Sequence, residues 1–173
     1  FMETVIGSSL LSNNLAHAFA EKTMGGMRMP LGGGWRFAMD REDAGVSQQW
    51  FARDLSGRIR LPGILQSQGY GDEISVDTPW VAALPRDMRW YLLPQYQAYT
   101  KPGNVKVPYL SQPPRHYLGL AWYQRDLDIP PGWKGKRAHL VLERPRWETT
   151  VWVDDSRIGS NNSLCAPHEY DLG

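Results

Sequence analysis

The chain has 173 residues, which is enough for one domain with a hydrophobic core. Its formal net charge of +1, with no basic stripe and no Cys/His spacing typical of a metal site, gives no support for a nucleic-acid partner, a bound metal or a cofactor. The one cysteine, Cys165, excludes an internal disulfide, and no apolar run is long enough to cross a membrane.

Residues 1–30 are expected to be a flexible or weakly helical lead-in. Residues 1–20 are mildly apolar and end in Ala18-Phe19-Ala20, a small-residue pattern found at signal-peptide cleavage sites. Polar side chains interrupt this stretch and no basic residue precedes it, so it is a poor signal peptide as written. A signal-peptide remnant, which favours a periplasmic or secreted protein, and a helical lead-in both stay open.

Short alternating segments dominate the first half of the chain. Residues 34–40 predict a first strand, because their three large apolar side chains fall on one face. Residues 58–61 predict a strand that Pro62-Gly63 ends. Residues 74–81 predict another short strand, and residues 50–51 lie in a segment that could form one helical turn.

Residues 84–114 are the least regular stretch of the sequence. They combine many prolines with several Trp and Tyr side chains and show no clear periodicity. A stretch of this length inside a compact domain is unusual, and it is often functional when it is ordered.

The second half reads as a row of short strands joined by turns. The predicted strands are residues 120–129, 138–143 and 147–153, and the polar turn at 154–156 leads into a short return at 157–159. Cys165 is expected to be a buried or half-buried structural side chain. Many short strands with turn residues between them predict an all-β fold, an antiparallel β-sandwich of the jelly-roll kind.

Several short pieces of sequence occur in an order that points to a known family. The pieces are Leu61-Pro62-Gly63, Ala121-Trp122-Tyr123-Gln124-Arg125, Ile129-Pro130, Trp133 to Arg137, Leu140 to Glu143, Thr149 to Val153, Ile158-Gly159 and Pro167 to Leu172. Together they resemble the N-terminal sugar-binding domain of glycoside hydrolase family 2, the family of bacterial β-galactosidases, β-glucuronidases and β-mannosidases. The resemblance covers residues 31–173 and implies a galactose-binding-domain-like sandwich.

The resemblance implies that this chain is non-catalytic. In the family both catalytic glutamates come from a TIM barrel further along the chain, so we expect these residues to pack on that barrel and to shape a pocket for a β-glycoside or oligosaccharide. Glu143 and Glu148 are closely spaced, but nothing suggests that they converge as the acid and nucleophile of glycoside hydrolysis. An independent carbohydrate-binding module and a structural sandwich without sugar contact are the alternatives.

Two loops match family loops that reach the sugar. We call residues 75–80 the Asp77 loop and residues 159–164 the Asn161 loop. Asp77 stands where β-galactosidases commonly carry Asn, which puts a galactoside preference in doubt, although a carboxylate can still accept two hydroxyl hydrogen bonds. The candidate substrate-binding residues are Asp77, Trp80, Asn161, Asn162 and Ser163. Plain turns would explain both loops equally well.

Two further features leave alternatives open. Family members cross the region of residues 82–114 with a shorter loop, so it looks like an insertion here. It is either an Ω-like loop packed by its own aromatic side chains or a lid or wall beside a saccharide site. Arg115, Arg144 and Arg146 could bind a uronate carboxylate. Alternatively, they form a solvated cluster at strand ends or contact a neighbouring domain.

Overall fold

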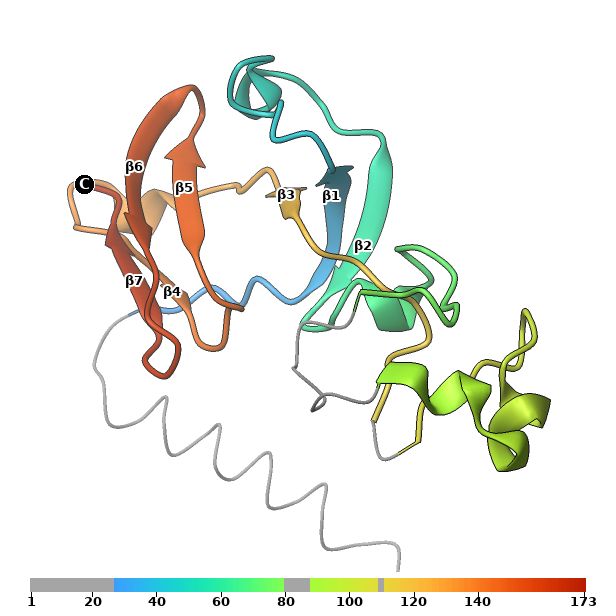
Figure 1. Ribbon diagram of the computed structural model, residues 1–173. Coiled ribbons are helices and arrows are strands. Elements are labelled where there is room, and N and C mark those ends of the chain that lie inside the picture. The colour runs from blue at the N-terminus through green and yellow to red at the C-terminus, as the bar shows by residue number, and fades with distance from the viewer. Residues whose placement is uncertain (1–26, 80–87, 109–110) are drawn as a thin grey trace, which may run out of the picture. The chain divides into compact units, whose positions relative to one another are not determined.

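The computed structural model describes residues 27–79, 88–108 and 111–173 (Figure 1). The chain divides into two units, one formed by Phe1–Leu31 with Ile129–Lys136 and the other by Gly32–Asp128 with Arg137–Gly173. The described part of the first unit contains the short 3-10 helix η5 (Pro131–Trp133). The predicted lead-in falls mostly on residues 1–26, which lie outside the described residues.

The second unit begins with a three-stranded antiparallel sheet. β1 (Gly33–Asp40) lies between β2 (Gly57–Leu61) and β3 (Leu120–Gln124), in the order β2-β1-β3. All three strands fall within or beside segments that the alternating pattern predicts, since a strand places every second side chain on the same face. Pro62 follows β2 as expected, because it has no N–H to donate to a ladder.

The later strands form two antiparallel pairs. β4 (His139–Leu142) pairs with β7 (His168–Asp171), and β5 (Thr149–Val153) pairs with β6 (Ser156–Asn161) across a tight turn and a bulge. In Figure 1 these four strands lie on one side of the second unit and the first sheet lies on the other. The fold is an antiparallel β-sandwich, which confirms the predicted class.

The space between the layers is filled by aromatic rings. Trp122 of β3 lies 5.0 Å from Trp152 of β5, measured between ring centroids. Phe51 stacks on Trp152 at 5.9 Å with an angle of 4° between the ring planes, and Trp50 lies 6.2 Å from Trp122. Phe51 belongs to the one-turn helix that the sequence predicts. The 3-10 helices of this unit are η1 (Trp50–Ala52), η2 (Gln66–Gln68), η3 (Met88–Leu92) and η4 (Pro94–Tyr99).

The other face of the first sheet is covered by the chain that follows β2. Phe37 is 2% exposed and lies 4.7 Å from Tyr70 and 5.3 Å from Tyr123, between ring centroids.

The Gln68 amide accepts a hydrogen bond from the Arg60 N–H at 2.8 Å and donates one to the Arg60 carbonyl at 2.9 Å. It satisfies the free edge of β2 as a neighbouring strand would.

The strand predicted at residues 74–81 is wrong over its described part. Residues 74–79 have no strand partner, and residues 76–77 form a turn. The Thr78 hydroxyl accepts from the Ser75 N–H at 2.8 Å, and the Ser75 hydroxyl accepts from the Asp77 N–H at 3.1 Å. Short hydroxyl side chains therefore satisfy the backbone locally and replace the ladder.

The burial predicted for Cys165 is also wrong. Its side chain is exposed, in the connection between β6 and β7. The neighbouring Ala166 N–H donates to the Ser163 hydroxyl at 3.1 Å, so this connection is held by local hydrogen bonds at the surface. A small apolar residue in such a connection has no core to enter.

Candidate functional site

An open depression of about 350 Å³ lies beside the Asp77 loop. Its polar lining comes from Asp72, Glu73, Ser75, Asp77, Thr78 and His116. Pro79 and Leu118 add apolar surface. Carboxylate, hydroxyl and imidazole groups beside apolar surface suit a ligand that carries both hydroxyl groups and C–H faces.

The turn leaves the Asp77 carboxylate available to a ligand. Thr78 is buried, and its hydroxyl is used by the Ser75 N–H, while the Ser75 hydroxyl is used by the Asp77 N–H. The Asp77 side chain is exposed and makes no hydrogen bond or ion pair with any other described residue. The turn therefore presents a carboxylate whose acceptor sites are all unused by the described part of the chain.

The floor of the depression is fixed by an ion pair and a short ladder. Asp72 and His116 exchange backbone hydrogen bonds of 2.7 and 3.0 Å. The Arg41 guanidinium donates to both Asp72 carboxylate oxygens, at 2.8 and 3.1 Å. These hydrogen bonds hold the pKa of Asp72 below its usual value, so it stays ionised at neutral pH. Arg41 also lies 5.3 Å from the centre of the Tyr117 ring, where burial raises the pKa of the tyrosine hydroxyl.

A chain of hydrogen bonds supports the Asn161 loop from inside the sandwich. His168 is fully buried; its Nε2 lies 2.9 Å from the Ser163 carbonyl and its Nδ1 lies 2.6 Å from the Thr149 hydroxyl. Because a carbonyl can only accept, Nε2 carries the proton and Nδ1 accepts from Thr149. The Tyr170 hydroxyl, 2.6 Å from the Thr149 hydroxyl, completes the chain. The Asn161 side chain caps the Ser163 N–H at 3.0 Å.

The structure does not bring the described candidate residues together in one site. Asp77 lines the depression, whereas Trp80 lies outside the described residues. Asn161 and Ser163 are half-buried and Asn162 is exposed. Between described residues, no hydrogen bond or ion pair joins the Asn161 loop to the Asp77 loop. The two loops are therefore two separate candidate contacts.

Sequence reasoning missed the residues that fix the depression, namely Arg41, Asp72 and Tyr117. One signal was present. Asp72 and Glu73 precede the segment at 74–81, and Arg115 follows the irregular stretch at 84–114. The guanidinium of Arg115 lies 3.4 Å from the Glu73 carboxylate. Opposite charges at the two ends of a long loop indicate that the ends meet.

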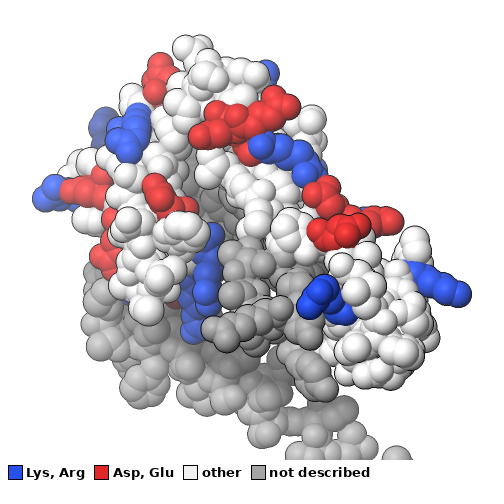
Figure 2. All heavy atoms as spheres, in the orientation of Figure 1, with Lys and Arg blue, Asp and Glu red and all other residues white. Residues whose placement is uncertain are grey.

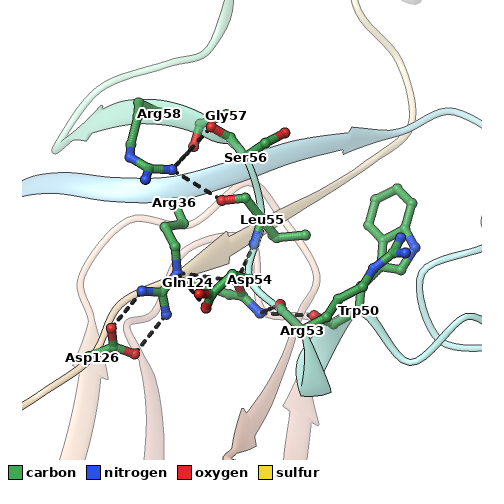
Figure 3. Close-up of polar contacts among 10 residues, drawn as sticks. All are labelled: Arg36, Trp50, Arg53, Asp54, Leu55, Ser56, Gly57, Arg58, Gln124 and Asp126. Atoms are coloured by element: carbon green, nitrogen blue, oxygen red, sulfur yellow. Dashed lines mark hydrogen bonds and ion pairs between the residues drawn. The ribbon is translucent and has the colours of Figure 1, made fainter.

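A second network fastens the chain after η1 to the first sheet (Figure 3). The Gln124 amide donates to the carbonyls of Trp50 and Arg53, both at 2.8 Å, and accepts from the Leu55 N–H at 3.0 Å. Arg36, its register partner on β1, grips both Asp126 carboxylate oxygens at 2.5 and 2.7 Å. Gln124 belongs to one of the sequence pieces that carry the family resemblance, and here its role is structural.

The remaining charged candidates are spread over the surface. Glu143, Glu148, Arg144 and Arg146 are all exposed, in the connection between β4 and β5. Arg115 instead pairs with Glu73, which lines the depression. On the face shown in Figure 2, acidic and basic side chains are interspersed, with no broad basic surface for a polyanion.

The described residues contain no group of three or more His, Cys, Asp and Glu side chains that could hold a metal ion. No helix formed by the described residues is long and apolar enough to cross a membrane.

The family model described as "Glycosyl hydrolases family 2, sugar binding domain" matches residues 29–173. This match covers most of the chain, so the chain belongs to the sugar-binding domains of glycoside hydrolase family 2, as the sequence resemblance predicts.

One solved structure supports the fold independently. The beta-glucuronidase of an uncultured Clostridium species is similar with a TM-score of 0.51 and 17% sequence identity, over 84% of this chain. The match covers 21% of that protein, so the chain spans about a fifth of its length. At this identity the likeness shows the fold alone.

Proposed function

We propose that this domain is non-catalytic and forms one wall of a glycoside-binding pocket. In this proposal it packs against a TIM barrel of the same parent enzyme, and the barrel supplies both catalytic carboxylates for hydrolysis of a β-glycoside or oligosaccharide. The proposal rests on the Asp77 carboxylate, because it is exposed in the depression and forms no hydrogen bond or ion pair with a described residue. It would accept hydrogen bonds from two sugar hydroxyls.

Exposed apolar side chains beside both loops support docking on a further domain. Leu118 lines the depression and is 57% exposed, and Leu164 at the end of the Asn161 loop is 65% exposed. Leu120, at the start of β3, is also exposed. Covering such exposed apolar side chains with another domain would remove their surface from water, as protein–protein contacts do.

The proposal is tested by giving the purified 173-residue chain aryl β-glycosides and, separately, simple sugars. We expect no turnover, and no heat in calorimetry with galactose, glucuronate or their oligomers. Detectable turnover, with contaminating enzyme excluded, would overturn the non-catalytic role. Tight oligosaccharide binding by the isolated chain would instead favour an independent carbohydrate-binding module.

A further inference from the structure

The long excursion between β2 and β3 closes on itself at its base. The backbone bridge between Asp72 and His116 and the ion pair between Glu73 and Arg115 join residues at its two ends. Glu73 and Arg115 are 42 positions apart in the sequence. We call residues 73–115 the pinned loop, of which residues 73–79, 88–108 and 111–115 are described. Ordered loops of this length inside a domain are often functional.

The pinned loop has an apolar core of its own. Trp90, Val105 and Val107 are buried together, with exposed fractions of 6%, 8% and 7%. Tyr96 packs on this cluster with its ring 6.2 Å from that of Trp90. The Gln112 amide holds the cluster's backbone, because it accepts from the Val107 N–H at 2.8 Å and donates to the Val105 carbonyl at 2.9 Å.

The Asp77 turn is anchored on this core. Ile74 and Val76 are partly buried and pack against the Trp90 cluster. They alternate in sequence with Ser75 and Asp77, both of which line the depression. The apolar residues of the segment therefore attach it to the pinned loop, while its polar residues remain at the surface.

We propose that Trp90 and Val107 are positioning residues for the Asp77 carboxylate. Through Ile74 and Val76 they fix the turn that presents it, so the core of the pinned loop sets how well the pocket recognises sugar hydroxyls. A hydrogen-bonding group must be held to within about 0.5 Å of its productive position to act well. This proposal rests on the function proposed above for Asp77.

The test is a double-mutant cycle in the full-length enzyme, with an aryl β-glycoside as substrate. Asp77→Ala is expected to raise KM about tenfold or more, because even one hydrogen bond to a charged group contributes that much and the carboxylate would accept two. Trp90→Ala and the milder Val107→Ala are each expected to raise KM about threefold or more in the wild type, with kcat nearly unchanged. In the Asp77→Ala background neither should raise KM further, because both act through the same carboxylate.

Leu92→Ala is the matched control, since Leu92 lies in η3 near Trp90 but is 62% exposed. It should leave KM unchanged. Circular dichroism and thermal melting verify that each variant folds. If Trp90→Ala does not fold, the test uses Val107→Ala alone. An equal rise of KM with and without Asp77 would overturn the positioning role, and so would an unchanged KM in a folded Val107→Ala while Asp77→Ala raises it. An unchanged KM in Asp77→Ala would overturn the proposed function and this inference with it.

Discussion

Replacing Asp40 by Asn should destabilise the domain far more than the small change in shape suggests. Asp40 is 3% exposed and ends β1. Its carboxylate accepts from the Ala44 N–H at 2.8 Å, the Gly45 N–H at 2.7 Å and the Trp122 indole N–H at 3.0 Å. These donors approach both oxygens. An Asn side chain has one acceptor oxygen, so its NH₂ group must face at least one buried N–H.

The expected loss is about 3 kcal/mol, because a hydrogen bond to a charged group contributes roughly 1.5–3 kcal/mol and the replaced oxygen leaves a donor unsatisfied. Urea-induced unfolding at pH 7 measures it. The control is Asp43→Asn: Asp43 is exposed with a φ of 53°, a conformation that Asn tolerates, so we expect a change within about 0.5 kcal/mol.

The loss should also depend on pH. Burial alone would raise the pKa of Asp40, but the hydrogen bonds from Ala44, Trp122 and Gly45 outweigh it and the pKa lies below the ordinary 3.8. A carboxyl with a lowered folded-state pKa stabilises the fold above 3.8, and this contribution is lost as pH falls through the lower folded value. The difference in free energy of unfolding between wild type and Asp40→Asn should therefore become smaller below pH 3.8. Equal stabilities at pH 7, or a gap that does not change with pH, would refute the reasoning.

Two further predictions concern the core and the Asn161 loop. Gly45→Ala should lower the free energy of unfolding, measured by urea titration, by about 2 kcal/mol or more. The reason is that the added Cβ would lie 2.1 Å from Nε1 of Trp122. A change below about 0.5 kcal/mol would contradict this close packing. Thr149→Val should cost about 1–3 kcal/mol and speed amide exchange in the Asn161 loop, since buried His168 loses a partner. Thr150→Val, next to it, should change neither, and equal effects of both variants would contradict the role of the hydrogen-bond chain.

The strands were predictable wherever apolar side chains alternate with polar ones. β1 follows that rule, because Trp35, Phe37 and Met39 fall on one face and Phe37 is buried. β7 (His168–Asp171) is polar by composition, and its burial depends on partners of His168 and Tyr170 that lie about twenty residues away. Alternation alone could not identify it. The strand predicted at residues 74–81 shows the opposite error. Ile74 and Val76 alternate with polar residues as in a strand, but they pack on the core of the pinned loop.

The candidate site was predictable in part for the same reason. Asp77 could be named from the family resemblance, and the structure places it in the depression. The contacts around Asp77 join residues far apart in the chain. Arg41 pairs with Asp72, and Asp72 forms a backbone bridge with His116. Local patterns in a sequence do not contain such pairings.

The most direct test of the central claim, that this domain binds substrate without catalysing its hydrolysis, is the steady-state kinetics of the full-length enzyme carrying Asp77→Asn. An amide keeps one acceptor oxygen and loses the charge, so we predict that KM for the glycoside rises severalfold while kcat stays within about twofold of wild type. A loss of kcat by several orders of magnitude would make Asp77 part of the catalytic machinery and contradict the claim. An unchanged KM would show that the Asp77 carboxylate does not contact the substrate.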